Sequence, residues 1–246
     1  DAGSDATICE GSAYTLSTAS ATNAASVTWS SNGTGSFDNV NLVNATYTPS
    51  AADILNGSVI LTMTVTSASP CAGDIDQMTL TINPQAIVSA GTDATICESS
   101  TYTLSMATAT DYTSLLWTSS GTGTFDDATI LAATYTPSAA DIAAGNVTLT
   151  LTAQSAAPCV EAIDAMVLTI SLQATADAGT DGTICQGEQY VITDAVASNF
   201  SSVIWSSTGS GMFISGNTLT PTYIPSQLDI LAGSVVLTLI ASNPPC

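Results

Sequence analysis

Six cysteines are the residues of this chain whose type and spacing most clearly predict covalent chemistry. The first series recurs every 88 residues, and each member of the second follows by 61 or 62 positions: Cys9, Cys97 and Cys185, then Cys71, Cys159 and Cys246. The chain has no His, and an even number of cysteines without His favours disulfides over metal ligation. Disulfides persist in oxidising places, so we expect a secreted protein located outside the cell or on its surface.

The pairing of these cysteines has two solutions. The default is one bridge within each repeat, as in Cys9–Cys71, which closes a loop of about 62 residues and contributes roughly 4 kcal/mol in the chain-entropy model. The other pairs are then Cys97–Cys159 and Cys185–Cys246. In a standard immunoglobulin-like topology, however, the two turns involved lie at opposite ends of the domain. Staggered bridges, Cys9–Cys159 and Cys97–Cys246, would instead join neighbouring repeats, and this alternative stays open.

Cations are missing from the whole chain. It has no Lys, Arg or His and 20 acidic residues, for a formal charge of −20. Nucleic-acid binding needs Lys or Arg, a P-loop needs its Lys, and hydrolytic triads and HExxH zinc sites need His. Paired carboxylates for glycoside hydrolysis are also absent, because the one adjacent pair, Asp126 and Asp127, would face opposite ways on a strand. The composition predicts no enzyme and no nucleic-acid partner.

Acidic residues near the ends of the repeats are the candidate metal ligands. The set is Asp1, Asp5, Asp74, Asp76, Asp93, Asp164, Asp177 and Asp181. Ca²⁺ takes six to eight oxygen ligands, and a bound cation would relieve the self-repulsion of a chain at −20. No DxDxDG-type loop is present, so ordered Ca²⁺ stands beside diffuse counterions as an alternative, and no other cofactor is expected.

A recurrent Asp in each repeat has a structural interpretation. Asp53, Asp141 and Asp229 each stand three residues after a Ser, which is the spacing of a capping box, and a Gly follows four residues later. We expect a single helical turn between two strands rather than a catalytic or metal site.

The repeat itself indicates the fold. Each copy has segments of alternating apolar and polar residues, such as 59–65 and 78–82, separated by Gly, Asn, Ser and Pro turns. About seven such strands with one Trp on the third are typical of an immunoglobulin-like β-sandwich. A β-propeller or a solenoid is the competitor, but a propeller would need two blades in each repeat, and the two halves of a repeat do not resemble each other. We predict an all-β linear array of three such domains, at 1–88, 89–176 and 177–246, joined by short, stiff connections.

The aromatic residues are assigned to the core. Trp29, Trp117 and Trp205 keep the repeat spacing, and the glycine-rich segment from Trp29 to Phe37 is predicted to be a tight hairpin with core aromatics on its flanks. An exposed aromatic patch for stacking sugars is the alternative, and it requires the three Trp side chains to be accessible.

The third repeat stops at Cys246, before its last strand, and about 17 more residues would complete it by analogy with the other copies. A sandwich without this strand has an exposed sheet edge. We expect the array to continue, with a strand from a neighbour as the alternative. No apolar run is long enough for a membrane span, and no signal peptide is seen at the start.

Four segments together resemble a known family. They are AGTDATICE at 90–98, YTLS at 102–105, LLWTSSGTGTF at 115–125 and ATYTPSAADI at 133–142. They are similar to the PKD-like, immunoglobulin-like tandem repeats of very large secreted surface proteins of Bacteroidota. That resemblance implies export by a type IX system and service in adhesion or gliding, with most repeats acting as spacers. The family usually carries some Lys and Arg, so their absence here is a departure.

The sequence thus favours a structural or adhesive extracellular fibre or stalk of disulfide-stapled repeats. Its partners would be neighbouring repeats or copies of itself, and surface glycans. The alternative is a surface adhesin module that binds carbohydrate or captures a ligand with Ca²⁺.

Overall fold

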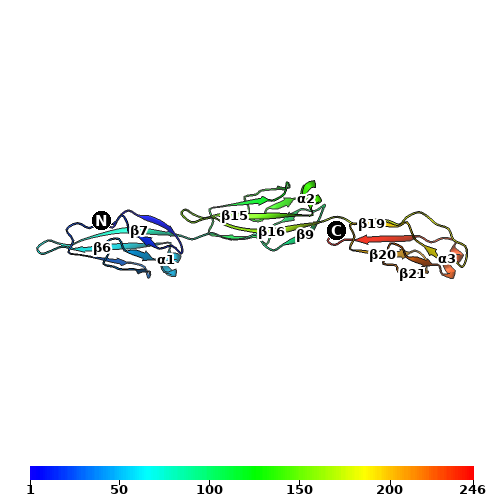
Figure 1. The fold of residues 1–246 in the computed structure, drawn as a ribbon, viewed down its shortest axis with the longest axis horizontal. Coiled ribbons are helices and arrows are strands. Elements are labelled where there is room, and N and C mark those ends of the chain that lie inside the picture. Colours follow the sequence, from blue (N-terminus) through cyan, green and yellow to red (C-terminus); the bar gives the residue numbers. More distant parts are fainter.

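The structure is a computed structural model that describes all residues from 1 to 246. It consists of three β-domains arranged end to end in a row, here called unit 1, unit 2 and unit 3 (Figure 1). Each unit has its own cluster of buried apolar residues. The three helices have six residues each, and no helix is long and apolar enough to cross a membrane.

Unit 1 has one four-stranded sheet in the order β1-β7-β6-β3 and one three-stranded sheet in the order β2-β5-β4. Its elements are β1 (Ala6–Cys9), β2 (Tyr14–Thr15), β3 (Ser26–Ser31), β4 (Ser36–Phe37), β5 (Thr46–Thr48), α1 (Ala51–Asn56), β6 (Ser58–Thr66) and β7 (Asp74–Asn83). The edge strand β1 runs parallel to β7, and β6 pairs antiparallel with both β7 and β3.

Unit 2 repeats this plan and adds a small two-stranded sheet, β11-β8. Its elements are β8 (Ile87–Ser89), β9 (Ala94–Cys97), β10 (Tyr102–Thr103), β11 (Thr108–Thr110), β12 (Ser114–Ser119), β13 (Thr124–Phe125), β14 (Thr134–Thr136), α2 (Ala139–Ala144), β15 (Asn146–Gln154) and β16 (Ala162–Ser171). The predicted boundary between residues 88 and 89 falls inside β8, which pairs with β11 of unit 2.

In unit 3 the sequence ends before the positions of β7 and β16, and the sheet that has four strands in units 1 and 2 consists of β20 and β23 alone, beside a three-stranded sheet in the order β18-β22-β21. Its elements are β17 (Thr175–Asp177), β18 (Tyr190–Val191), β19 (Val196–Ser198), β20 (Ser202–Ser207), β21 (Met212–Ile214), β22 (Thr222–Ile224), α3 (Gln227–Ala232) and β23 (Leu237–Ser242). Residues 182–185, which match β1 and β9 in sequence, form no strand here.

The cores follow from the period-2 alternation of the long strands. In β15 the inward residues Val147, Leu149 and Leu151 are buried, and the Thr residues between them are half-buried. Trp117 lies opposite Leu151 in the register of β12 and β15. All three Trp side chains are buried, at 2–5% exposure. They leave no accessible indole face, so sugar stacking on these rings, the aromatic alternative of the sequence analysis, is wrong.

The glycine-rich segment after the first Trp is not the predicted hairpin. β3 pairs with β6, whereas β4 pairs with β5 in the other sheet, so this segment crosses between sheets instead of folding back on its own strand. The flanking aromatics do meet, since the ring centroids of Trp29 and Phe37 are 6.1 Å apart. The prediction failed because Gly-containing turns mark any reversal of the chain, whether within a sheet or between two sheets.

Candidate functional site: the disulfide-locked junctions

The two disulfides of the chain join neighbouring units. Cys9 of unit 1 is bonded to Cys159 of unit 2, and Cys97 of unit 2 to Cys246 of unit 3, with Cα–Cα distances of 4.9 Å in both. The default pairing within each repeat is therefore wrong, and the staggered alternative is what the structure contains. The remaining two predicted disulfide residues, Cys71 and Cys185, are free and exposed.

The topology explains the stagger. The first-series cysteine ends the strand β1 or β9, at the end of the unit that also holds the helical turn, whereas the second-series cysteine lies in the hairpin at the opposite end. In Figure 1 the hairpin between β15 and β16 reaches back toward unit 1, and the C-terminal end of the chain reaches back toward unit 2. A bridge within a unit would have to span its length, so each hairpin cysteine meets the turn of the preceding unit instead.

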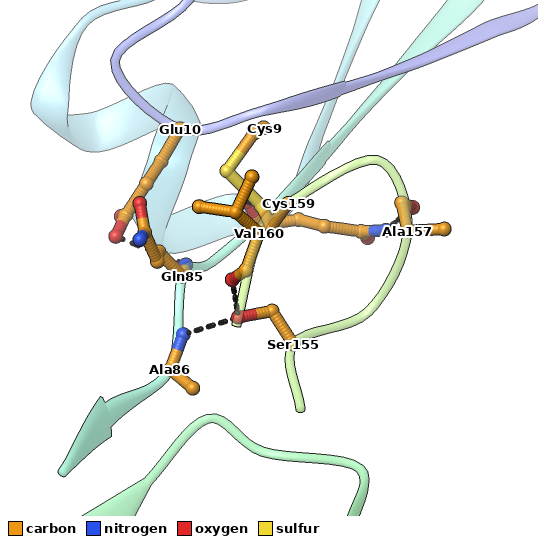
Figure 2. The surroundings of a disulfide bond; sticks show 9 residues. Cys9, Glu10, Gln85, Ala86, Ser155, Ala157, Cys159 and Val160 are labelled. Carbon is orange, nitrogen blue, oxygen red and sulfur yellow. Dashed lines mark hydrogen bonds between the residues drawn. A yellow bond between two sulfur atoms is a disulfide. The ribbon is translucent and has the colours of Figure 1, made fainter. Parts of the chain in front are cut away.

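Hydrogen bonds surround the first bridge (Figure 2). The Asn83 side chain, at the end of β7, donates to the carbonyl oxygen of Ala157 in the hairpin of unit 2, at 2.7 Å. In the connection, the N–H of Gln85 donates to the Glu10 carboxylate at 3.1 Å, and that of Ala86 donates to the Ser155 hydroxyl at 2.9 Å. The connection is thus held on one side by unit 1 and on the other by unit 2.

The second junction uses an equivalent but not identical set of contacts. The N–H of Gln173 donates to the Glu98 carboxylate at 2.9 Å, which repeats the contact between Gln85 and Glu10. The Asn243 side chain donates to the carbonyl oxygen of Leu172 at 2.9 Å. Both junctions therefore combine a short peptide connection, a disulfide and polar contacts between adjacent units.

Sequence reasoning did not single out the junction residues other than the cysteines. Glu10 and Glu98 occupy the same repeat position, directly after a first-series cysteine, and Gln85 and Gln173 occupy the same position in the connections. The repetition of these two residue types at equivalent positions was the signal in the sequence that could have identified them. Once the staggered pairing of the cysteines is known, it indicates a Glu acceptor and a Gln donor at each junction.

The candidate calcium ligands lie along the seam between the first and last strands of a unit. The carboxylate of Asp76 accepts from the N–H of Ala2, and that of Asp164 accepts from the N–H of Ala90, at 2.7 and 2.8 Å. Asp5 accepts from Thr79 across the same seam at 2.7 Å. These carboxylates fasten the edge strand, and the segment that leads into it, to the last strand beside it in the same sheet.

The other candidate acids are equally dispersed. Asp93 accepts from the N–H of Val167 at 2.8 Å, and Asp1, Asp74 and Asp177 each accept from an N–H one or two residues along the chain. Asp181 lies exposed in unit 3. No group of three or more Asp, Glu or Cys side chains gathers closely enough to hold a metal ion. The Ca²⁺ prediction therefore rests on net charge alone.

The predicted capping role of the recurrent Asp is confirmed, and its carboxylate also accepts hydrogen bonds from outside the helical turn. In unit 1, Ser50 and Asp53 form a complete capping box, and Gly57 ends the helix in the left-handed conformation. The Asp53 carboxylate also accepts from the N–H groups of Thr34 and Gly35, at 2.9 and 2.8 Å. It thus clamps the crossing segment between the sheets to the helical turn.

The hydroxyl of a buried Tyr completes this clamp. Tyr47 donates to Asp53, Tyr135 to Asp141 and Tyr223 to Asp229, at 2.8, 2.8 and 2.9 Å. Burial opposes ionisation of the Asp141 carboxyl, but the N–H groups of Ser138 and Thr122 outweigh it and lower its pKa to about 2. The N–H of Ser226 likewise lowers the pKa of Asp229 to about 2. These carboxylates stay charged at neutral pH and have a structural task.

The fold is immunoglobulin-like, as comparison with solved structures shows. A variant of the three-domain titin fragment I67–I69 aligns with 98% of this chain and 91% of its own, at a TM-score of 0.51 and 13% identity. Another I67–I69 fragment of titin gives the same coverage and identity at 0.50. Extracellular domains 3–5 of Drosophila OTK align at 0.39 and 9% identity, over 97% and 93% of the two chains. No protein-family model and no curated protein matches the chain.

Proposed function

We propose that this chain is a stiff structural segment of an extracellular fibre or stalk. The observation that carries the proposal is the double covalent attachment at both junctions, where a peptide connection and a disulfide join each pair of units. Two attachments at different points of an interface remove the hinge that a single connection leaves free. The result would be a rod whose length and direction are preserved under load.

The chemistry of the chain supports a location outside the cell. The bridges need an oxidising compartment to persist. A chain without Lys or Arg offers trypsin-like proteases no cleavage site. Cohesion depends on apolar cores, strand pairing and disulfides, because no side-chain salt bridge can form. The resemblance to secreted surface repeats agrees with this location and with a role in adhesion, either as a spacer or as the adhesive part itself.

The rod is tested by small-angle X-ray scattering on the intact chain, oxidised and then reduced. We expect the oxidised chain to show a narrow distance distribution with a maximum near the summed length of three units. Reduction should broaden it and lower the radius of gyration, because only the peptide connections remain. Equal flexibility of the two forms would contradict the proposal.

Matched variants separate the bridges from general effects of thiols. Cys9→Ser opens the first junction and Cys97→Ser the second, so each should introduce one bend. Cys71→Ser and Cys185→Ser remove only free, exposed thiols and should leave the scattering of the oxidised chain unchanged. A bend in these controls would show that rigidity does not depend on the bridges.

Two ligands are proposed in addition to the role as a stiff segment, namely calcium and surface glycans. Ca²⁺ at the acidic seams would reduce repulsion in a chain at −20 and stiffen the rod further. Isothermal titration calorimetry, in which Ca²⁺ is added to protein freed of metal by a chelator, tests calcium binding, and the variant Asp76→Asn is expected to weaken it.

A glycan array tests glycan binding. Binding there would have to use surfaces other than the buried Trp rings.

A further inference from the structure

The two disulfides divide the chain into three routes that connect the same two points. Bridge 1 is Cys9–Cys159 and bridge 2 is Cys97–Cys246. The first, second and third routes from one bridge to the other are residues 10–96, 98–158 and 160–245. The routes are therefore covalently in parallel, although the three units follow one another along the rod.

The part of the first route that forms unit 1 begins and ends at bridge 1. In the parallel register of β1 and β7, Cys9 lies opposite Asn83, where β7 ends. The carbonyl oxygen of Asn83 is 3.3 Å from Sγ of Cys159 in the same bridge. The first route thus leaves bridge 1, passes through unit 1 and returns to the bridge. Only residues 84–96, which contain β8 and most of β9, then cross unit 2 to bridge 2.

Unit 3 is attached to bridge 2 in the same way. Cys97 lies opposite Ser171, where β16 ends, and the carbonyl oxygen of Ser171 is 3.2 Å from Sγ of Cys246. The third route therefore crosses unit 2 as residues 160–171, ten of which form β16, before it passes through unit 3. This crossing segment is already extended, since a strand rises about 3.4 Å per residue and a taut chain reaches at most about 3.6 Å.

The crossing segments hold little spare length, and the second route is the body of unit 2 from β10 to β15. When the two bridges are pulled apart, the first route can lengthen only by drawing residues out of unit 1. The third route can lengthen only by drawing them out of unit 3, and the second only by unfolding unit 2. The bridges separate only if all three routes lengthen at once.

We propose that the two bridges form a device that limits extension under tension, in which the three units share the load and none opens alone. The inference deepens the proposed stiff segment and rests on it, because it assigns the covalent path of a load along that rod. The shortest route sets the limit. It has 62 positions, from Cys97 to Cys159, so the bridges can separate to no more than about 220 Å.

The limit is tested by force spectroscopy on the intact chain, held in optical tweezers by peptide tags added at its two ends. We expect the oxidised chain to lengthen in one concerted event and to stop at about 250 Å, the reach of residues 1–9 and the shortest route. After reduction it should open in separate steps to about 880 Å, because the three units then bear the load one after another. Single-unit steps in the oxidised chain, or extension well beyond about 250 Å, would overturn the proposal.

Removal of bridge 1 should release one unit in particular. In the variant Cys9→Ser with Cys159→Ser, the load reaches bridge 2 through residues 1–97, so unit 1 bears it alone and the limit rises to about 350 Å. Residues 98–245 then lie in a closed ring outside this path. An unchanged limit would contradict the proposal. If this variant fails to fold, the reduced unchanged chain supplies the comparison.

The variants Cys71→Ser and Cys185→Ser are the matched controls, because they remove thiols that take part in neither bridge. Each should keep the single concerted event and the limit of about 250 Å in the oxidised chain. A longer limit in either control would mean that the bridges do not set it, and the proposal would be wrong.

Load sharing is tested by weakening one unit. Leu61 is fully buried in unit 1, so Leu61→Ala loosens that unit only. In the oxidised chain the opening force should fall by a small fraction, because units 2 and 3 still hold the other two routes. In the variant without bridge 1 it should fall by a larger fraction, because unit 1 bears the load alone. Equal fractional losses would show that the load is not shared.

Scattering and force spectroscopy let the two proposals fail separately. A chain that is stiff in solution but opens unit by unit under tension would keep the proposed rod and refute load sharing. A chain that bends in solution but stops at about 250 Å under tension would refute the rod and keep the limit set by the bridges.

Discussion

Units 2 and 3 are copies of the same repeat, but they differ in the neighbours of one strand, β15 in unit 2 and β23 in unit 3, which precedes the turn with the second-series cysteine. In unit 2, β15 has a partner on each side, and 16 buried residues form the core. In unit 3, β23 has a partner only on one side, and the core has 5 buried residues. Leu149 is fully buried, whereas its counterpart Leu237 is only half-buried.

The comparison shows which parts of the repeat depend on the last strand. Residues 94–97 form β9 beside β16, yet residues 182–185 form no strand, although three of the four residues are the same. β23 also begins at Leu237, three positions later than β15 does in the repeat frame. An edge strand therefore needs its partner, and local sequence does not supply the pairing energy.

The helical turn and its clamp are independent of that strand. The capping box is complete in all three units, and the Tyr hydroxyl lies 2.8–2.9 Å from the Asp carboxylate in each. The repeat thus contains a local part, which forms in every unit, and a cooperative part, which forms only when the sheet is complete.

The largest difference is expected from matched core truncations. Leu149→Ala should lower the free energy of unfolding of unit 2 by about 3 kcal/mol, because it leaves a cavity in a fully packed site. Leu237→Ala should lower the free energy of unfolding of unit 3 by less than about 1 kcal/mol, since that side chain is only half-buried and lines an open groove of unit 3. Hydrogen exchange as a function of denaturant reports each unit separately. Equal costs would show that unit 3 is packed as well as unit 2.

The clamp gives the next largest effect. Asp141→Asn should destabilise unit 2 by about 2 kcal/mol, because an amide nitrogen at Oδ2 would face the N–H of Gly123 and the N–H of Ser138. Asp127→Asn is the control, because that carboxylate is exposed and bonds only to Thr129. If both variants melt alike, the clamp does not contribute to stability.

Much of the fold could be predicted from the sequence, because it follows from local patterns. The alternating strands and the capping boxes rest on signals within a few positions of one another, and the 88-residue repeat presents these signals, and the Trp residues, three times. The sheet that the segment after Trp29 enters could not be predicted in this way, because a hairpin and a crossing between sheets use the same turn residues. Only the positions of β5 and β6 decide between them.

The junctions were predictable in part. The spacing of Cys9 and Cys71 allows a bridge within the repeat, and loop length alone does not exclude it. What excludes it is the length of the unit between them, which depends on the complete topology. The polar contacts of Glu10 and Ser155 with the connection depend on the stagger and could not be placed before it was known.

The pH dependence of stability sharpens the distinction between the local and cooperative parts. The pKa of Asp141 and that of Asp229 are about 2 in the folded chain, below the value near 3.8 of a free carboxyl. Between about pH 4 and pH 2 the unfolded chain binds more protons, so stability is constant above this window and is lost as pH falls through it. Unit 2 and unit 3 should weaken together there, despite their different cores.

Thermal unfolding from pH 7 to pH 2, with hydrogen exchange to separate the units, checks this expectation. The pKa of Asp53 is also lowered: burial opposes ionisation, but N–H donors led by that of Ser50 outweigh it, so unit 1 should follow the same course. Asp141→Asn removes one titrating group and should make the profile of unit 2 alone less steep, while the carboxyls of Asp126 and Asp127, whose pKa values hydrogen bonds to Thr134 and Thr129 also lower, retain part of the dependence. A loss of stability that begins near pH 6 would point to groups other than these clamps.

The smallest effect concerns the seam that unit 3 lacks. The Asp164 carboxylate accepts from the N–H of the buried Ala90, whereas the sequence ends at Cys246, before the position that would correspond to Asp164 in unit 3. Asp164→Ala should cost about 1 kcal/mol, the contribution of one hydrogen bond. The amide of Ala90 should then exchange as fast as that of its counterpart Ala178 does in the unchanged chain. Asp164→Asn retains an acceptor oxygen and should restore most of the protection. If Ala90 stays protected in the Asp164→Ala variant, strand packing alone closes the seam and the Asp164 carboxylate does not contribute to it.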